Sequence, residues 1–264
     1  MVADLTESSL AGFPLDSLMF GGAPAPDLLA ARAGQTFPNA VMSQGYGLTE
    51  TNSVAVSFAG ADYSARPASC GLPCPVNDIM IMAGNTSAPV GEVGEVWLRG
   101  PNVMKEYWRD PGATEKALTK DGWLKTGDLG YLDRDGFLYI RDRIKDIIIR
   151  GGENIDSVSV ENALYADNRV MEAAAVGVPH PRLGEIVAAV ISVKPGFKGQ
   201  LTEASLIATA AKSLPKFAVP VLIIIQDEPL ERTESGKILK PELRKTARAA
   251  WEMRMKDDGS RTKL

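Results

Sequence analysis

The sequence is poor in the residues that bind metals and cross-link small domains. Its 264 residues include two cysteines, Cys70 and Cys74, and one histidine, His180. Zinc sites take most of their ligands from these two residue types, and a disulfide framework needs several cysteine pairs. We therefore expect neither, and an intracellular, reducing compartment fits the cysteine content best.

Long apolar runs and an excess of basic residues are also missing. No stretch approaches the ~20 apolar residues that a membrane-spanning helix needs. The opening "MVADLTESSL" has neither the basic nor the apolar region of a signal peptide. Lysine and arginine number 29 against 33 acidic residues, a formal net charge of −4. Because nucleic-acid binding normally requires a basic face, we predict no nucleic-acid partner.

What is present is an ordinary globular composition, with 45% hydrophobic residues. Residues 1–60 predict a short helix, a buried strand at 17–23 and a second helix near 26–35. Residues 66–145 contain short alternating strands with glycine and aspartate between them, which indicate an antiparallel sheet or a distorted barrel.

The pattern changes after residue 145, where strands alternate with helices as in a small α/β domain. The elements expected there are a helix at 157–166, strands at 172–178 and 185–193, a helix at 202–214, a strand at 219–225 and a helix at 240–255. We place the boundary between Arg143 and Gly151. The prediction is an α/β (α+β) fold in two domains, residues 1–144 and 145–264.

Four polar clusters carry the candidate chemistry, and the first is Thr49-Glu50-Thr51 after "GYGL". The glycines leave backbone amides accessible. A hydroxyl next to a carboxylate suits a phosphate and its Mg²⁺, which prefers oxygen and often takes one protein carboxylate. The alternative is an N-cap, in which Thr or Glu opens a helical turn.

Asp128 in "GWLKTGDLG" forms the second cluster. A carboxylate held in a tight turn can accept two hydrogen bonds from a vicinal diol, as acidic residues do on ribose. The alternative is an ordinary aspartate in a glycine-rich turn.

The third cluster is "RDRIKDIIIRGGENI", with Arg143 before a buried apolar run. Arg143 could donate forked hydrogen bonds to a ribose or phosphate oxygen, or its charge could simply be solvated. Gly151-Gly152 marks a turn, or a place where a ligand passes against bare backbone.

Lys237 in "ERTESGKILK" is the fourth cluster. A lysine on a Ser-Gly approach can be swung onto a developing negative charge, which it stabilises as a point charge. The alternative is an exposed surface lysine. A P-loop NTPase is excluded separately, because the sequence contains no G-x-x-x-x-G-K-[ST].

The order of these clusters resembles that of the adenylate-forming (AMP-binding) enzymes, which include acyl-CoA synthetases, luciferases and peptide-synthetase adenylation domains. The stretches that carry the resemblance, in the family's order, are "SQGYGLTETN", "GEVWLRGPNVMKEYW", "DGWLKTGDLGYLDRDGFLYIRDRIKDIIIRGGENI" and "LPKFAVPVLIIIQDEPLERTESGKILKPELRK". The resemblance covers essentially the whole chain. "GGENI" with "TESGKILK" is most similar to fatty or aryl acyl-CoA ligases.

The resemblance implies an ATP-dependent ligase that converts a carboxylic acid into an acyl-adenylate, and then into an acyl-CoA. Its cofactors and substrates are ATP, Mg²⁺ and CoA. The residues it implies for binding ATP or AMP are Gly21, Gly22, Ala23, Gln44, Gly45, Tyr46, Gly47, Leu48, Thr49, Asp128, Arg143 and Lys237.

The resemblance also implies individual roles. The catalytic residues are Lys237, Thr49 near the phosphate, and Glu50 as a Mg²⁺ ligand. Lys145 is the hinge about which a small mobile C-terminal domain rotates between the half-reactions. The residues that line the CoA tunnel are Gly151, Gly152 and Glu153.

Members of the family are normally about twice as long, so the chain resembles the C-terminal half of a synthetase. We expect it to make little or no acyl-CoA by itself, and to partner either the missing N-terminal half or further copies of itself. Residues 52–55 are small or apolar, which suits a fatty acyl chain, although a buried strand explains them equally. The C-terminal Thr262-Lys263-Leu264 differs from Ser-Lys-Leu only at its first position, so the compartment is cytoplasmic or peroxisomal.

Two other functions stay open at this point. A peptide-synthetase adenylation domain would hand its acyl group to a carrier protein instead of CoA. A non-catalytic product would bind nucleotide weakly or act as an interaction partner, and nucleotide binding without pyrophosphate exchange would identify it.

Overall fold

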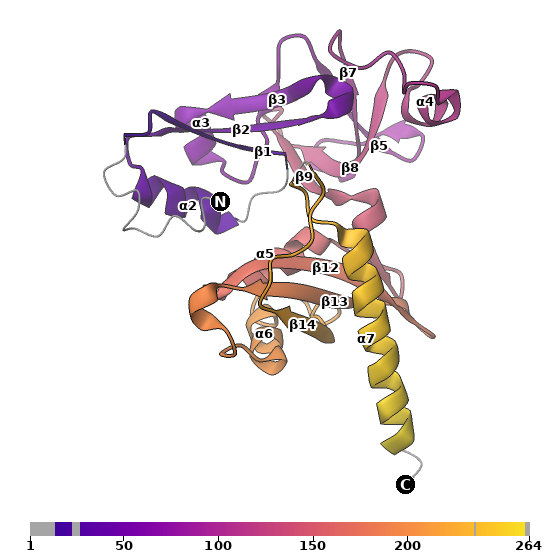
Figure 1. The fold of residues 1–264 in the computed structure, drawn as a ribbon. Helices are drawn as coiled ribbons and strands as arrows, with labels where there is room; N and C mark the ends of the chain where they lie inside the picture. The colour runs from indigo at the N-terminus through magenta and orange to yellow at the C-terminus, as the bar shows by residue number, and fades with distance from the viewer. Residues whose placement is uncertain (1–13, 23–26, 235, 262–264) are drawn as a thin grey trace. The chain divides into compact units, whose positions relative to one another are not determined.

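The computed structural model describes residues 14–22, 27–234 and 236–261 (Figure 1). The chain divides into two compact units, Met1–Lys145 and Asp146–Leu264. None of the helices in the described ranges combines the length and the apolar content that crossing a bilayer requires. The short helix expected before residue 14, and Ala23 among the site residues, lie outside the described residues.

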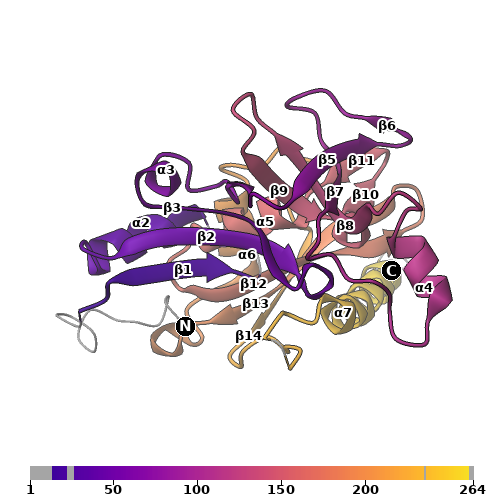
Figure 2. The same cartoon turned by 90° about the horizontal axis from the view of Figure 1, so that it is seen from above.

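The first unit begins with a four-stranded sheet of order β1-β2-β3-β4, of which β1, β2 and β3 lie side by side in Figure 2. Its strands are β1 (Ser17–Gly21), β2 (Val41–Leu48), β3 (Ser53–Ala59) and β4 (Leu72–Pro73). β1 and β2 are parallel and the other pairs are antiparallel. The helix α2 (Asp27–Thr36) lies between β1 and β2 in the chain, as a parallel pair requires. Beyond β3 follows α3 (Gly60–Ala65), whose Tyr63 packs with Phe20 and Ala33 in a small core.

The second sheet of this unit has the order β6-β5-β7-β8-β9 and is entirely antiparallel. Its strands are β5 (Asp78–Ala83), β6 (Thr86–Ser87), β7 (Gly94–Arg99), β8 (Leu124–Leu132) and β9 (Leu138–Arg143). Within the described residues its end strands β6 and β9 do not pair, so the sheet is open and the barrel alternative was wrong. The two sheets share one core, to which Val56, Ile81, Val96 and Leu138 contribute.

The second unit is built on a five-stranded sheet in which only β13 and β14 run parallel. Its strands are β10 (Ile148–Arg150), β11 (Glu153–Ile155), β12 (Val170–His180), β13 (Gly184–Val193) and β14 (Leu222–Gln226). Its helices are α5 (Ser157–Tyr165), α6 (Glu203–Ala210) and α7 (Lys240–Arg261). The remaining helical elements of the described residues are α4 (Pro111–Ala117) and the 3₁₀ turns η2 (Thr49–Thr51), η3 (Ile144–Asp146) and η4 (Pro195–Phe197).

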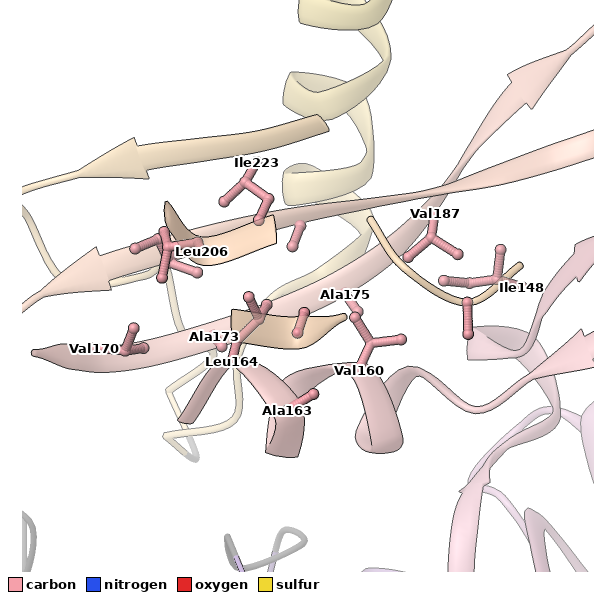
Figure 3. Packing of buried hydrophobic residues seen from close by; sticks show 14 of the residues in the cluster. Ile148, Val160, Ala163, Leu164, Val170, Ala173, Ala175, Val187, Leu206 and Ile223 are labelled. Atoms are coloured by element: carbon pink, nitrogen blue, oxygen red, sulfur yellow. The ribbon is translucent and has the colours of Figure 1, made fainter. Parts of the chain in front are cut away.

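The apolar run "IVAAVISV" explains why this sheet is covered on both faces. Successive side chains of a strand point to opposite faces. Val187, Ala189 and Ile191 pack with residues of α5 and α6, including Leu164 and Leu206, as Figure 3 shows for the labelled side chains. Ile186, Ala188 and Val190 belong instead to the clusters that contain residues of α7. A strand buried on both faces needs a continuous apolar run rather than an alternating one.

The expected α/β (α+β) class is confirmed, and the element positions differ mainly at their ends. The helix expected at 202–214 ends at Ala210, and residues 211–214 form a turn and a bend before Pro215, which disfavours helical conformation at Leu214. The strand expected from residue 219 begins at Leu222, and the last helix continues to Arg261. The hairpin of β10 and β11 was not predicted as a strand pair.

Candidate functional site

The turn that follows β2 is tight and conformationally unusual. A bulge falls between Tyr46 and Gly47, and a Cβ atom on Gly47 would lie 1.8 Å from the backbone oxygen of Ser53. Asn52 and Ser53 adopt positive φ angles of 52° and 110°, which are uncommon outside glycine. The chain therefore reverses abruptly, with Thr49–Thr51 at the tip of the reversal.

Thr51 satisfies the backbone of this turn. Leu48 N donates to Thr51 Oγ1 at 2.9 Å, and the Thr51 hydroxyl lies 2.8 Å from Ser53 O. The capping role that we considered for Thr49 or Glu50 is thus taken by Thr51. Thr49 is exposed and Glu50 is half-buried, so both side chains stay available for a ligand.

A loop between β7 and α4 braces the same turn through three hydrogen bonds. Asn102 Nδ2 donates to Thr51 O at 3.0 Å, and Met104 N donates to Glu50 O at 2.7 Å. Tyr107 Oη donates to Glu50 Oε1 at 2.7 Å. This hydrogen bond, followed by burial, raises the pKa of the Tyr107 hydroxyl to about 12. Sequence reasoning missed Tyr107, although it lies in the quoted stretch "GPNVMKEYW".

Asp128 lies in strand β8 rather than in the tight turn that we expected. Arg143, its register partner on β9, donates from Nε to Asp128 Oδ1 at 2.9 Å. Tyr46 Oη donates to the other carboxylate oxygen, Oδ2, at 2.7 Å. Asp128 is only 4% exposed. Burial and the neighbouring Asp128 charge raise the pKa of the Tyr46 hydroxyl well above its ordinary value.

Gly21 and Gly45 are register partners on the parallel strands β1 and β2. A Cβ atom on Gly21 would lie 2.8 Å from Gly45 O. The glycine therefore allows the backbones of the two strands to lie close to each other. Gly22 has a φ of 79°, which favours glycine. The carboxyl end of β1 thus lies beside Gly45, three residues before β2 ends, on the side of the sheet where α/β proteins bind ligands.

Gln44 is buried on β2, beside a thiol. Its Nε2 donates to Cys70 Sγ at 3.8 Å, while its Oε1 is buried with no hydrogen-bond partner in the described structure. Burial raises the pKa of the Cys70 thiol to about 11. An unpartnered buried amide oxygen is costly unless a further donor joins it.

In the second unit, Gly151 and Gly152 form the turn of the β10–β11 hairpin, with φ angles of 61° and 91°. Two successive positive φ angles are the signature of a two-residue hairpin turn, which explains both glycines without a ligand. Glu153, the first residue of β11, is exposed. Lys145 lies in the 3₁₀ turn Ile144–Asp146 at the end of the first unit.

Lys237 is exposed, and it lies in a loop whose backbone is held by hydrogen bonds on both sides of the lysine. Thr233 N donates to Lys237 O at 2.8 Å, and Lys237 N donates to Thr233 Oγ1 at 3.1 Å. Glu172 of β12 accepts hydrogen bonds from Leu230 N at 2.6 Å and from the Arg232 guanidinium. The loop backbone is therefore anchored while the lysine side chain reaches solvent.

Lys240, where α7 begins, fixes the other end of this loop. Its Nζ lies 2.7 Å from Glu161 Oε1 and 2.6 Å from Ser157 Oγ, both on α5.

The structure thus brings together Tyr46, Asp128 and Arg143 in the first unit, and Tyr46 lies with Gln44 on the strand that leads into the Glu50 turn. The described residues hold no cluster of three or more His, Cys, Asp or Glu side chains that could cage a metal. The carboxylate of Glu50 has no hydrogen-bond partner for Oε2 among the described residues. It fits a Mg²⁺ ion that takes its other ligands from phosphates and water.

Comparison with known proteins identifies related sequences and folds. The AMP-binding enzyme profile matches residues 2–108, and the profile of the AMP-binding enzyme C-terminal domain matches residues 159–237. Probable acyl-activating enzyme 6 of Arabidopsis thaliana is 39% identical over 262 residues, which is 94% of this chain and 47% of the relative. Feruloyl-CoA synthase of an Amycolatopsis species is 41% identical, covering 88% of this chain and 46% of that protein.

A solved structure shares the fold. O-succinylbenzoate coenzyme A synthetase of Bacillus subtilis, in complex with ATP and a magnesium ion, matches with a TM-score of 0.77 and 33% identity, over 90% of this chain and 49% of that chain. This chain spans less than half the length of each of these proteins. With both profiles matched in order and the fold shared, the chain belongs to the AMP-binding enzyme family.

Proposed function

We propose that this chain contributes the ribose-binding, cation-binding and thioester-forming residues of an ATP-dependent acid–thiol ligase. Such an enzyme joins a carboxylic acid to AMP with release of pyrophosphate, and then transfers the acyl group to the sulfur of CoA with release of AMP. The names of the relatives favour CoA over a carrier protein as the thiol.

The observation that carries the proposal is the arrangement around Asp128. Arg143 and Tyr46 each hold one oxygen of this buried carboxylate, beside β2. A carboxylate fixed in this way is suited to accept hydrogen bonds from the vicinal hydroxyls of a ribose. Arg143 is partly exposed, so it can reach the same sugar.

The proposed ligand of the divalent cation is Glu50. Glu50 would hold Mg²⁺ together with nucleotide phosphates, and the exposed Thr49 hydroxyl would contact phosphate oxygen. When bound, the cation neutralises phosphate charge and orients the triphosphate. The solved complex of the Bacillus subtilis relative with ATP and a magnesium ion supports this assignment.

The second unit has a proposed role as the mobile domain. We assign Lys237 to the charge that builds on the transferring phosphoryl group, Gly151, Gly152 and Glu153 to the CoA tunnel, and Lys145 to the hinge. A lysine on an anchored loop supports this role, because only its long side chain then needs to adapt to the substrate. The domains that we propose are residues 1–144 and 145–264.

The acid is proposed as a fatty or an aryl carboxylic acid. The names of two relatives refer to aryl acids, feruloyl and o-succinylbenzoyl. The residues that we connected with a fatty chain lie at the start of strand β3, where Ala55 is buried in the core between the sheets. A screen should therefore contain both classes of acid.

The remaining partner is proposed to be the part of the ligase that precedes this chain in its relatives. Within the described residues β1 pairs on one side only, with β2, and Met19 and Val41 are 60% and 51% exposed. An open strand edge beside exposed apolar side chains suits pairing with further chain. Further copies of the chain are the alternative occupant.

The compartment is proposed to be the cytoplasm or the peroxisome. A relative in Arabidopsis thaliana carries "peroxisomal" in its name. A fluorescent fusion that leaves Leu264 at the C-terminus would separate the two.

The test of the proposed function is acid-dependent ATP–pyrophosphate exchange, followed by CoA ligation. The chain alone should bind ATP yet make little or no acyl-CoA, and a chain extended to the length of its relatives should do both. An extended chain without exchange for any acid of either class would refute the proposal. Robust ligation by the 264-residue chain would refute the need for a partner.

A further inference from the structure

The loop of residues 100–107 donates three hydrogen bonds to the Glu50 turn. Two of its three hydrogen bonds fix backbone oxygens, those of Glu50 and Thr51. The third, from Tyr107, is the one that reaches the Glu50 side chain. Tyr107 and Glu50 are 57 positions apart in the chain, so this contact exists only after the first unit has folded.

The hydrogen bond from Tyr107 restricts a side chain that would otherwise be free. A half-buried glutamate has three side-chain torsions, and ordering such a side chain on binding costs conformational entropy. With Oε1 held at 2.7 Å by the phenol, one oxygen of the carboxylate is placed before any ligand arrives. Glu50 Oε2 has no hydrogen-bond partner among the described residues.

The chemistry of the donor suits a cation site. A phenol is neutral, so it orients the carboxylate without cancelling the negative charge that attracts a cation. A lysine or arginine in its place would compete with the cation for the same carboxylate. Groups that orient a metal-binding carboxylate typically change metal affinity by 10- to 100-fold when they are lost.

We propose that Tyr107 is a positioning residue that fixes Glu50 for a divalent cation. This inference rests on the proposed function, because Glu50 has to be the cation ligand for its orientation to matter. The inference goes beyond the proposed function because it assigns a role to Tyr107. Loss of the phenol hydroxyl should weaken nucleotide binding in the presence of the cation and leave cation-free binding unchanged.

The experiment uses the 264-residue chain with Mn²⁺ as the probe. The dissociation constant of ATP is measured by calorimetry with Mn²⁺ and with EDTA, and free Mn²⁺ is counted by electron paramagnetic resonance. The variants are Tyr107→Phe, Glu50→Gln and the double variant. The matched control is Tyr139→Phe, which removes a phenol that donates to Asp133 in the same unit at 3.3 Å.

The expected result is a loss of about tenfold in Mn²⁺-dependent ATP affinity for Y107F. Affinity in EDTA and the melting temperature should stay near those of the wild type, because the phenylalanine ring keeps its packing. Y139F should bind like the wild type. The double variant should bind no more weakly than E50Q, because the two residues act through one carboxylate.

The failures are distinguishable. If E50Q weakens Mn²⁺-dependent binding and Y107F does not, Tyr107 has no positioning role and the proposed function stands. Equal loss in Mn²⁺ and in EDTA for Y107F would show a general structural defect and would also overturn the inference. If the wild type shows no Mn²⁺-dependent binding, or E50Q matches it, the cation assignment of the proposed function fails and the role of Tyr107 fails with it.

Discussion

Asp128 and Arg143 are register partners on adjacent antiparallel strands, and the guanidinium Nε lies 2.9 Å from the carboxylate Oδ1. The pair is therefore held by the backbone of one hairpin, 15 positions apart along the chain. Cross-strand neighbours of opposite charge keep their geometry because the ladder of hydrogen bonds sets their spacing. The candidate ribose site is thus preformed within the first unit.

Replacing Asp128 by asparagine should weaken ATP binding about tenfold, which corresponds to ~1.4 kcal/mol. The amide keeps the shape of the side chain but can accept at only one atom, so one hydrogen bond to the sugar is lost. Calorimetry with ATP measures the change. Asp78→Asn is the control, because Asp78 pairs with Arg99 on an exposed part of the same sheet. Equal affinities for D128N and D78N would contradict the ribose assignment.

Replacing Tyr46 by phenylalanine should lower the free energy of unfolding of the first unit by about 1–3 kcal/mol. The change leaves Asp128 Oδ2 buried without its donor, and an unsatisfied buried acceptor is costly even though Arg143 still pairs with Oδ1. Urea denaturation followed by tryptophan fluorescence measures the effect. Tyr131→Phe serves as the control, since the Tyr131 ring stacks on Tyr139 and keeps that contact without its hydroxyl. An unchanged midpoint for Y46F would mean that water replaces the hydroxyl.

The two thiols should differ strongly in reactivity. Cys70 is buried with a pKa near 11, so at pH 8 only about one molecule in a thousand carries the reactive thiolate there. Cys74 is half-buried and should react first. Labelling by a disulfide reagent, read by peptide mass, should show Cys70 modification accelerating as the pH rises toward 11. Cys74→Ser isolates the slow site, and fast labelling of that variant at pH 8 would count against the buried thiol.

Replacing Glu172 by glutamine should loosen the loop that carries Lys237. The neutral amide loses the ion pair with Arg232 and weakens the hydrogen bond to Leu230 N. Amide hydrogen exchange in residues 231–239 should rise several-fold, while exchange in β13 stays slow. Glu242→Gln is the control, because its pair with Lys245 is exposed and contributes little. Unchanged exchange in E172Q would show that the loop is fixed by its own hydrogen bonds.

A fragment of residues 146–264 should fold alone, because its sheet has a core of its own between α5, α6 and α7. Within it, Leu206→Ala should lower the free energy of unfolding by about 2–5 kcal/mol, since Leu206 is completely buried. Guanidinium denaturation followed by circular dichroism tests both statements. The exposed Met253→Ala should change little. A fragment without a cooperative transition would make the second unit dependent on the first.

Local residue patterns predicted much of the secondary structure. The helix at residues 26–35 and the strand at 185–193 were placed within one residue of α2 and β13. Local periodicity succeeds there because side-chain spacing and turn residues act over a few positions. The same reasoning wrongly predicted a turn at Asp128. Flanking glycines occur both in turns and in strands with a register shift, and Asp128 lies in such a strand.

The motifs by themselves determined the family and indicated Glu50, Asp128, Arg143 and Lys237 as site residues. They could do so because each of these residues lies in a sequence motif, and the motifs follow the order known for the family. Only the tertiary structure decided what each side chain contacts. Tyr46 meets Asp128 across 82 positions, and Tyr107 meets Glu50 across 57. The first contact depends on which strands pair and in which register, because a shift of one residue would turn Tyr46 or Asp128 to the other face of its sheet. The second depends on how a loop folds back onto a turn. Strand pairing depends on the burial of whole sheet faces at once. The residues of a single segment therefore do not predict which strand it pairs with.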